Sequence, residues 1–134
     1  AKDKKIVFTN GCFDLIHSGH IQYLEEAKSL GDILIIGLNS DNSVKKIKGK
    51  GRPINTHEDR ALILAALDVV DYVVIFSEEN PYKLIEAIRP SILVKGADYE
   101  AKDVIGADLV DDVVLVKFIA GKSSTEIIKR INSI

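Results

Sequence analysis

The chain has 134 residues, of which 46% are hydrophobic and 28% charged, a composition typical of one soluble globular domain with its own core. The formal net charge of −2 gives no general attraction to nucleic acid or to an anionic membrane, so we expect neither as a partner. With one cysteine, no secretory signal pattern and no apolar run near the roughly 20 residues that span a bilayer, we expect a cytoplasmic location.

Short apolar runs alternate with segments of helical spacing along the chain. The runs predict strands at residues 4–9, 33–38, 72–76, 92–94 and 113–116. Helical spacing, Ser or Thr caps and one Asn-Pro start predict helices at residues 19–30, 57–68, 81–89 and 123–131. The lysine- and glycine-rich residues 42–56 are expected to form a mobile loop.

This alternation predicts an α/β fold in a single domain over residues 1–134. We expect a Rossmann-like, doubly wound parallel sheet of five strands with helices on both faces. Ligands bind such sheets beyond the C-terminal ends of the strands, where the strand order switches direction. The candidate site is therefore expected among the loops that follow the strands.

The stretch Thr9–His20 joins the first predicted strand to the first predicted helix. It places His17 and His20 three positions apart at the mouth of the helix, on one face of its first turn. The unpaired N–H groups and the dipole of a helix N-terminus attract anions. Two potentially cationic imidazoles beside such a site indicate a polyphosphate whose charge changes during a reaction. No Gly-x-Gly-x-x-Gly follows the first strand, which argues against a Rossmann dehydrogenase.

Two other roles stay open for these histidines. Both can be ordinary surface or capping residues, and both can bind a metal together with Cys12. Because no fourth ligand of suitable type sits at a characteristic spacing, we expect no metal held by the protein. Asp14 is expected to stabilise the turn rather than to act as a base.

The residues Asn10-Gly-Cys-Phe-Asp14, followed by His17-Ser-Gly-His20, resemble the signature of the HxGH nucleotidyltransferases, the cytidylyltransferase-like superfamily. Over nearly its whole length the chain is most similar to the adenylyltransferases that make ADP-glycero-β-D-manno-heptose. The resemblance implies that ATP and D-glycero-β-D-manno-heptose 1-phosphate react to give ADP-heptose and pyrophosphate, for lipopolysaccharide or other surface sugars. It also implies that Mg²⁺ accompanies the ATP.

The same resemblance implies roles for individual residues. His17 and His20 would stabilise charge on a five-coordinate α-phosphorus, and Lys48, in a Lys-Gly-x-x-Arg-Pro arrangement, would reach the triphosphate. The alternative is that the lysine run is a solvated face. Substrate contacts are expected from Lys45, Arg52 and Arg60. Nucleotide contacts are expected from Thr9, Asn10, Gly11, Cys12, Phe13, Gly19, Gly96, Asp98, Ser123, Ser124 and Thr125.

Two other functions remain open. A glycerol-3-phosphate cytidylyltransferase would use CTP, but those relatives carry Arg-Thr-Glu-Gly-Ile-Ser before the last helix, where this chain has Phe-Ile-Ala-Gly-Lys-Ser at residues 118–123. The second open function is that of a module that binds a nucleotide without turning it over. The sequence contains no methionine, so we expect it to be part of a longer product. A homodimer and a sugar kinase, fused or separate, are left open as partners.

Overall fold

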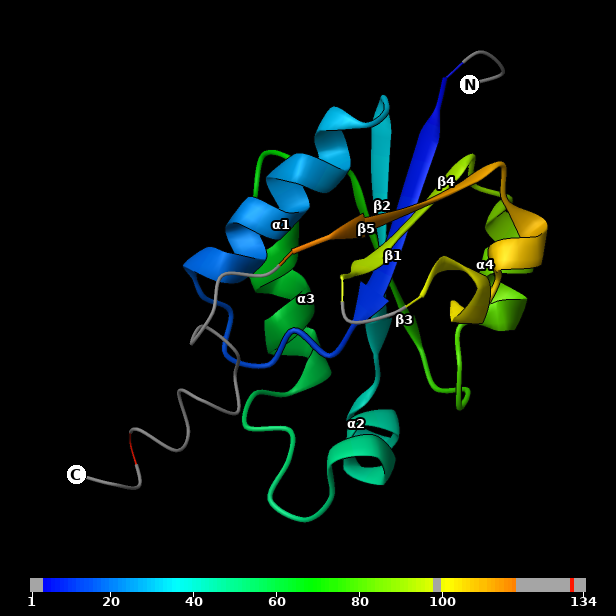
Figure 1. Cartoon of the computed structure of the whole chain (residues 1–134). Coiled ribbons are helices and arrows are strands. Elements are labelled where there is room, and N and C mark those ends of the chain that lie inside the picture. The colour runs from blue at the N-terminus through cyan, green and yellow to red at the C-terminus, as the bar shows by residue number, and fades with distance from the viewer. Residues whose placement is uncertain (1–3, 98–99, 118–130, 132–134) are drawn as a thin grey trace.

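The five strands form one parallel sheet, in the order β3-β2-β1-β4-β5. The structure is a computed structural model that describes residues 4–97, 100–117 and 131 (Figure 1). The strands are β1 Ile6–Gly11, β2 Ile33–Asn39, β3 Tyr72–Phe76, β4 Ile92–Gly96 and β5 Asp112–Val116. This confirms the predicted doubly wound parallel sheet, although β1 begins and ends two residues later than the apolar run indicated.

Helices cover both faces of the sheet (Figure 1). They are α1 Ser18–Ser29, α2 Asp41–Lys48, α3 His57–Ala65 and α4 Tyr82–Ile88, and two short 3₁₀ turns, η1 Ala101–Asp103 and η2 Ala107–Leu109, precede β5. In Figure 1, α1 and α3 lie on one side and α4 on the other. No helix in the described part of the chain is long and apolar enough to cross a membrane.

Two hydrophobic cores, one on each face, follow from the alternation of side chains along the central strands. On β1, Val7 belongs to the core under α1 and α3, whereas Phe8 belongs to the core under α4. On β4, Val94 and Leu93 divide in the same way. The chain runs from β1 outward to β2 and β3 and then returns to the other side of β1, so the switch point lies between β1 and β4.

Residues 42–56, expected as one mobile loop, begin instead as helix α2. Ser40 caps this helix by accepting a hydrogen bond from the Ser43 N–H at 3.3 Å, and Val44 is buried beneath it. The lysines gather in its last turn, where cations favour the helix dipole. The predicted cap of α3 is confirmed, because the Thr56 hydroxyl accepts from the Asp59 N–H.

Several predicted features lie outside the described residues. These are Asp98, the last helix and its cap residues Ser123, Ser124 and Thr125. The site described below therefore consists of the part built by β1, β2 and β4 and the segments that follow them.

Candidate functional site

His17 and His20 cap the start of α1 with their own imidazoles. The Nδ1 atom of His17 accepts a hydrogen bond from the Gly19 N–H at 3.1 Å, and Nδ1 of His20 accepts one from the His17 N–H at 3.2 Å. The two ring centroids lie 4.0 Å apart with the planes inclined by 36°. The pair is thus held as a unit at a helix N-terminus, with the Gly19 amide used in the cap.

These two hydrogen bonds also define where each imidazole carries its proton. A nitrogen that accepts a hydrogen bond carries no hydrogen, so both neutral rings have their proton on Nε2. Burial, together with the neighbouring His17 and Lys48, lowers the pKa of His20 from 6.5 to about 4. The sequence suggested cationic imidazoles, but at neutral pH His20 is a neutral Nε2–H donor.

The turn before α1 has an unusual backbone. Phe13 and Leu15 have positive φ angles of 47° and 60°, which residues with side chains rarely adopt. The Phe13 ring lies 5.5 Å from the ring of His20, and a Cβ on Gly11 would meet the Phe13 ring at 3.0 Å. A side chain at position 11 would therefore require the Phe13 ring to shift slightly from its place beside the histidine pair.

Asp14 ties the lysine-rich loop to this turn. Its buried carboxylate accepts hydrogen bonds from the Ile54 N–H at 2.6 Å, the Asn55 N–H at 3.0 Å and Nε of Arg52 at 3.2 Å. Burial alone would raise the pKa of Asp14, but these three donors outweigh it and hold the pKa below its ordinary value. The structural role predicted for Asp14 is confirmed.

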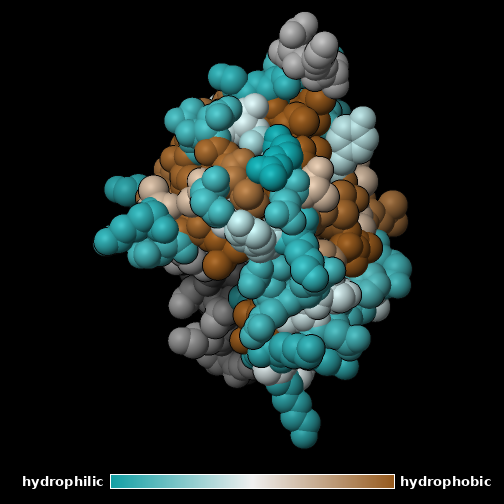
Figure 2. Space-filling model, turned by 90° about the vertical axis from the view of Figure 1, so that its right-hand side faces the viewer, coloured by the Kyte–Doolittle hydropathy of each residue, from teal (hydrophilic) through white to brown (hydrophobic). Residues whose placement is uncertain are grey.

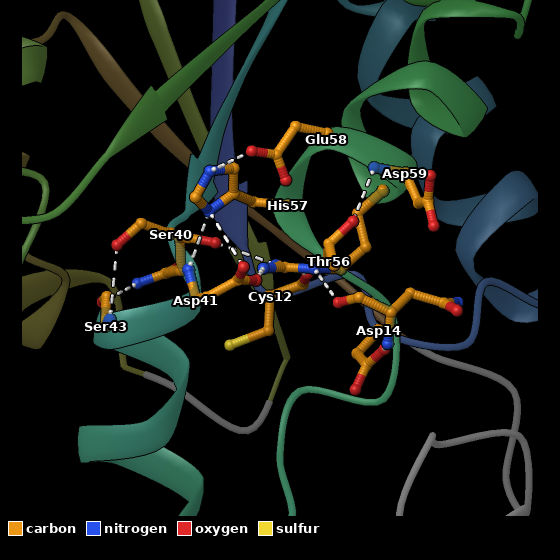
Figure 3. A network of polar contacts seen from close by, with 12 residues as sticks. Cys12, Asp14, Ser40, Asp41, Ser43, Thr56, His57, Glu58 and Asp59 are labelled. Carbon is orange, nitrogen blue, oxygen red and sulfur yellow. Dashed lines mark hydrogen bonds and ion pairs between the residues drawn. The ribbon is translucent and has the colours of Figure 1, made fainter.

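Arg60 is the largest fully buried side chain among the described residues. Its guanidinium donates to the carbonyls of Cys12, Asn39 and Asn55 at 2.7, 2.8 and 3.1 Å, and to the Asp41 carboxylate at 2.8 Å. Figure 3 shows the surrounding network from close by. The expected substrate contact does not fit this placement, because a guanidinium without exposed surface and with four protein acceptors holds segments together instead.

Like Arg60, Thr9 is buried and bonded within the protein, which does not fit its expected contact with the nucleotide. Its side chain is fully buried, and its hydroxyl lies 2.9 Å from the Tyr23 hydroxyl on α1. The Thr9–Tyr23 contact fixes α1 against β1, which in turn fixes the histidine pair at the end of the sheet.

Three side chains of ligand type, Asp41, His57 and Glu58, offer atoms within 4.8 Å of one another, the one such group in the described residues. The two nitrogens of His57 face different partners: Nδ1 accepts from the Asp41 N–H at 3.0 Å and Nε2 lies 3.1 Å from the Glu58 carboxylate (Figure 3). Asp41 is also paired with Arg60. We interpret the group as a polar brace between α2 and α3. Among the described residues, Cys12, His17 and His20 do not form a group of this kind.

Lys48 lies close enough for its charge to act on the site. It lowers the pKa of His20, and it opposes the burial that raises the pKa of the Cys12 thiol. Gly49 and Gly51, which follow it, have positive φ angles with open space around them. The lower part of the molecule, where α2 lies, is mostly hydrophilic on the face shown in Figure 2. Lys45, on the same helix, is exposed.

Two further cations lie near the site: Arg52, which the sequence already indicated, and Lys95, which it did not. Nη2 of Arg52 is buried and has no hydrogen-bond partner among the described residues, so the arginine that binds Asp14 has a donor group that those residues do not use. Nζ of Lys95, near the end of β4, donates to the Asn10 side-chain oxygen on β1 at 3.4 Å. Sequence reasoning missed Lys95, although its position just before Gly96 at the C-terminal end of a predicted strand was a usable signal.

Comparison with known proteins decides the family. The model of the family described as cytidylyltransferase-like matches residues 8–130. The chain belongs to the cytidylyltransferase-like family. It is accordingly a nucleotidyltransferase domain, and the turn that carries the two histidines lies within the matched region.

Curated relatives of this cytidylyltransferase-like chain are longer proteins. It is 66% identical over 128 residues to the bifunctional protein HldE of Aliarcobacter butzleri, covering 96% of the chain and 27% of that protein. It is 59% identical over 131 residues to the bifunctional protein HldE of Wolinella succinogenes, covering 98% of the chain and 28% of that protein. The chain therefore spans little more than a quarter of these relatives.

Solved structures agree with the fold. A lipopolysaccharide core biosynthesis protein from Thermoplasma volcanium superposes with a TM-score of 0.72 at 30% identity, covering 87% of this chain and 99% of that one. A pantoate-beta-alanine ligase from Francisella tularensis superposes with a TM-score of 0.63 at 21% identity, covering 100% of this chain and 72% of that one. The second likeness concerns the fold alone.

We expect the free energy of unfolding of Arg60→Met to be lower by about 3–5 kcal/mol, because the substitution leaves three carbonyls and the half-buried Asp41 carboxylate without their donor. Urea denaturation followed by circular dichroism measures this loss. Lys102→Met, at an exposed surface ion pair, is the control and should change stability by less than about 1 kcal/mol. An Arg60→Met protein of normal stability with a raised KM for substrate would restore the substrate-binding role.

We expect both histidines to show the Nε2–H tautomer in ¹⁵N NMR spectra, and His20 to stay neutral down to a midpoint of about pH 4. Between pH 6.5 and 4, His20 binds a proton in the unfolded chain but stays neutral in the folded protein. The free energy of unfolding should therefore fall as the pH falls through this window. His20→Gln should lose part of this pH dependence. A His20 midpoint near 6.5, or a proton on Nδ1, would contradict the capping geometry.

Proposed function

We propose that this chain transfers the adenylyl group of ATP to D-glycero-β-D-manno-heptose 1-phosphate and releases pyrophosphate. The observation that supports the nucleotidyl transfer is the capped histidine pair, in which both imidazoles have Nδ1 bound by a backbone amide and Nε2–H left as the other ring donor, at the helix N-terminus that follows β1. The choice of acceptor is supported by the sequence resemblance, by relatives named HldE and by a structural neighbour named for lipopolysaccharide core biosynthesis.

In this reaction an oxygen of the sugar phosphate attacks the α-phosphorus in line, and the bond to the β-phosphate oxygen breaks. The attacking phosphate is already a nucleophile, so no strong base is required. The Nε2–H groups of His17 and His20 would donate to the α-phosphate oxygens as negative charge builds on them. Lys48 and Nη2 of Arg52 would stabilise the triphosphate from the loop side.

Mg²⁺ is proposed to enter with ATP and to offset the charge of its phosphates. The donors described here are imidazole N–H groups and cations, which suit phosphate oxygens rather than a metal ion. The nearest carboxylate in the described turn, Asp14, already accepts three hydrogen bonds. We therefore assign no protein ligand to Mg²⁺ and derive no step through it.

The substrates are tested by pyrophosphate release, with ATP or CTP paired with either D-glycero-β-D-manno-heptose 1-phosphate or glycerol 3-phosphate. We expect turnover only with ATP and the heptose phosphate. Turnover with CTP and glycerol 3-phosphate would favour the cytidylyltransferase alternative. ATP binding without turnover on any acceptor would favour a nucleotide-binding module.

The second activity of the longer relatives is proposed to be a sugar kinase that supplies the acceptor. The use of ATP fits the expected cytoplasmic location.

A matched pair of substitutions separates capping from catalysis at position 17. His17→Asn keeps an acceptor at the place of Nδ1 but has no counterpart of Nε2–H, and Asn is a good N-cap residue. We expect it to retain stability while losing at least about 100-fold in kcat, the size expected for one transition-state donor. His17→Ala should lose both activity and about 1 kcal/mol of stability. Full activity in His17→Asn would leave His17 a capping residue only.

A further inference from the structure

Lys95 and Asn10 lie on the opposite side of the sheet from α1. On β1 the side chains alternate, so that Thr9 reaches Tyr23 on α1, whereas Phe8 packs in the core under α4. Asn10 shares the face of Phe8 because it is two residues further on. On β4, Leu93 belongs to the core under α4, and Lys95 shares its face for the same reason. The 3.4 Å contact between Nζ of Lys95 and the Asn10 oxygen agrees with this placement.

The placement has a chemical consequence at the switch point. The histidine pair lies at the start of α1, on the side to which Thr9 points, and the Lys95–Asn10 pair reaches the same end of β1 from the other side. An in-line displacement needs its attacking and leaving oxygens on opposite sides of the phosphorus. Lys48 and Arg52, which would hold the leaving phosphates, follow β2, whereas Lys95 lies on β4, on the other side of β1. Lys95 is therefore placed to hold an anionic group that approaches the α-phosphorus from the side away from that loop.

We propose that Lys95, positioned by Asn10, binds the phosphate group of the acceptor, a sugar 1-phosphate, and that it thereby orients the attacking oxygen. This inference rests on the proposed function and extends it to a residue outside the histidine turn and the lysine loop. Lys95 is half-buried, and its Nζ is already held by the Asn10 side chain at the end of the strand. Nζ of Lys95 and the side-chain amide of Asn10 both offer N–H donors to phosphate oxygens.

The test measures acceptor binding directly, so that it does not depend on turnover. Calorimetry with D-glycero-β-D-manno-heptose 1-phosphate and a non-hydrolysable ATP analogue should show a Kd at least about 10-fold higher for Lys95→Met than for the unsubstituted protein, which corresponds to about 1.4 kcal/mol. The Kd for the ATP analogue alone should change less than twofold. Lys95→Arg should bind the acceptor better than Lys95→Met, because it restores the positive charge.

Lys117→Met is the matched control, since Lys117 is an exposed lysine directly after β5, at the same end of the neighbouring strand. It should bind both ligands normally. If Lys95→Met does not fold, judged by its thermal transition, Lys95→Gln and Asn10→Ser replace it in the same titration.

The outcomes separate this inference from the proposed function. Pyrophosphate release by the unsubstituted protein, with equal acceptor Kd in Lys95→Met, overturns the role of Lys95 alone. A Lys95→Met protein that loses the ATP analogue but keeps the acceptor assigns the lysine to the nucleotide and also overturns it. An unsubstituted protein that binds no heptose phosphate overturns both the acceptor and the inference. In steady-state kinetics the supporting result is a raised KM for the acceptor with an unchanged KM for ATP.

Discussion

Two hydrogen bonds from backbone amides to imidazole nitrogens set the geometry at the start of α1. The first N–H groups of a helix need acceptors, and Ser, Thr, Asp or Asn usually supplies them. When a histidine does so, the accepting nitrogen cannot carry the proton, and the ring must present an N–H on its other nitrogen. The capping role and the proposed catalytic role, which the sequence leaves as alternatives, are therefore compatible, because the cap orients the Nε2–H donors that the proposed reaction requires.

This arrangement depends on the turn before α1, whose backbone conformation requires stabilisation by surrounding residues. Two residues with side chains, Phe13 and Leu15, adopt positive φ angles, and such conformations persist only where the surroundings hold them. Asp14, between them, accepts hydrogen bonds from the Ile54 and Asn55 amides of the loop, and Arg60 donates one to the carbonyl of Cys12. Both anchors are buried charges whose hydrogen bonds span more than 35 positions in the sequence, so the loop and the turn are expected to order together.

The sequence predicted those features that depend on residues close together in the chain. Apolar runs placed all five strands, and their alternation with helices predicted the parallel sheet, because a parallel pair needs a crossover between its strands. The spacing of His17 and His20 predicted their adjacency, since one helical turn brings such residues together. Helix α2 was missed because its apolar face consists of little more than Val44 and Ile47 amid charged residues.

What the sequence did not reveal depends on long-range contacts. Arg60 sits in a helix whose pattern also suits a surface arginine, and its burial arises only when the ends of β1 and β2 meet α3. The same holds for Lys95, whose partner Asn10 is 85 positions away and becomes a neighbour through the pairing of β1 with β4. The local sequence is the same whether a lysine at the end of a strand points into solvent or lies beside a binding site.

The end of β1 also explains why this fold suits a displacement at phosphorus. Successive side chains of a strand point to opposite faces, so Thr9 and Asn10 serve different sides of the sheet although they are adjacent. Thr9 secures α1, with its imidazole donors, on one side, and Asn10 meets Lys95 on the other. Under the proposed function, a phosphorus bound at this strand end would have the imidazole donors on one side and Lys95 on the other. The proposed in-line transfer needs groups that approach the phosphorus from opposed directions, and the pleat of this strand places side chains on both of its faces.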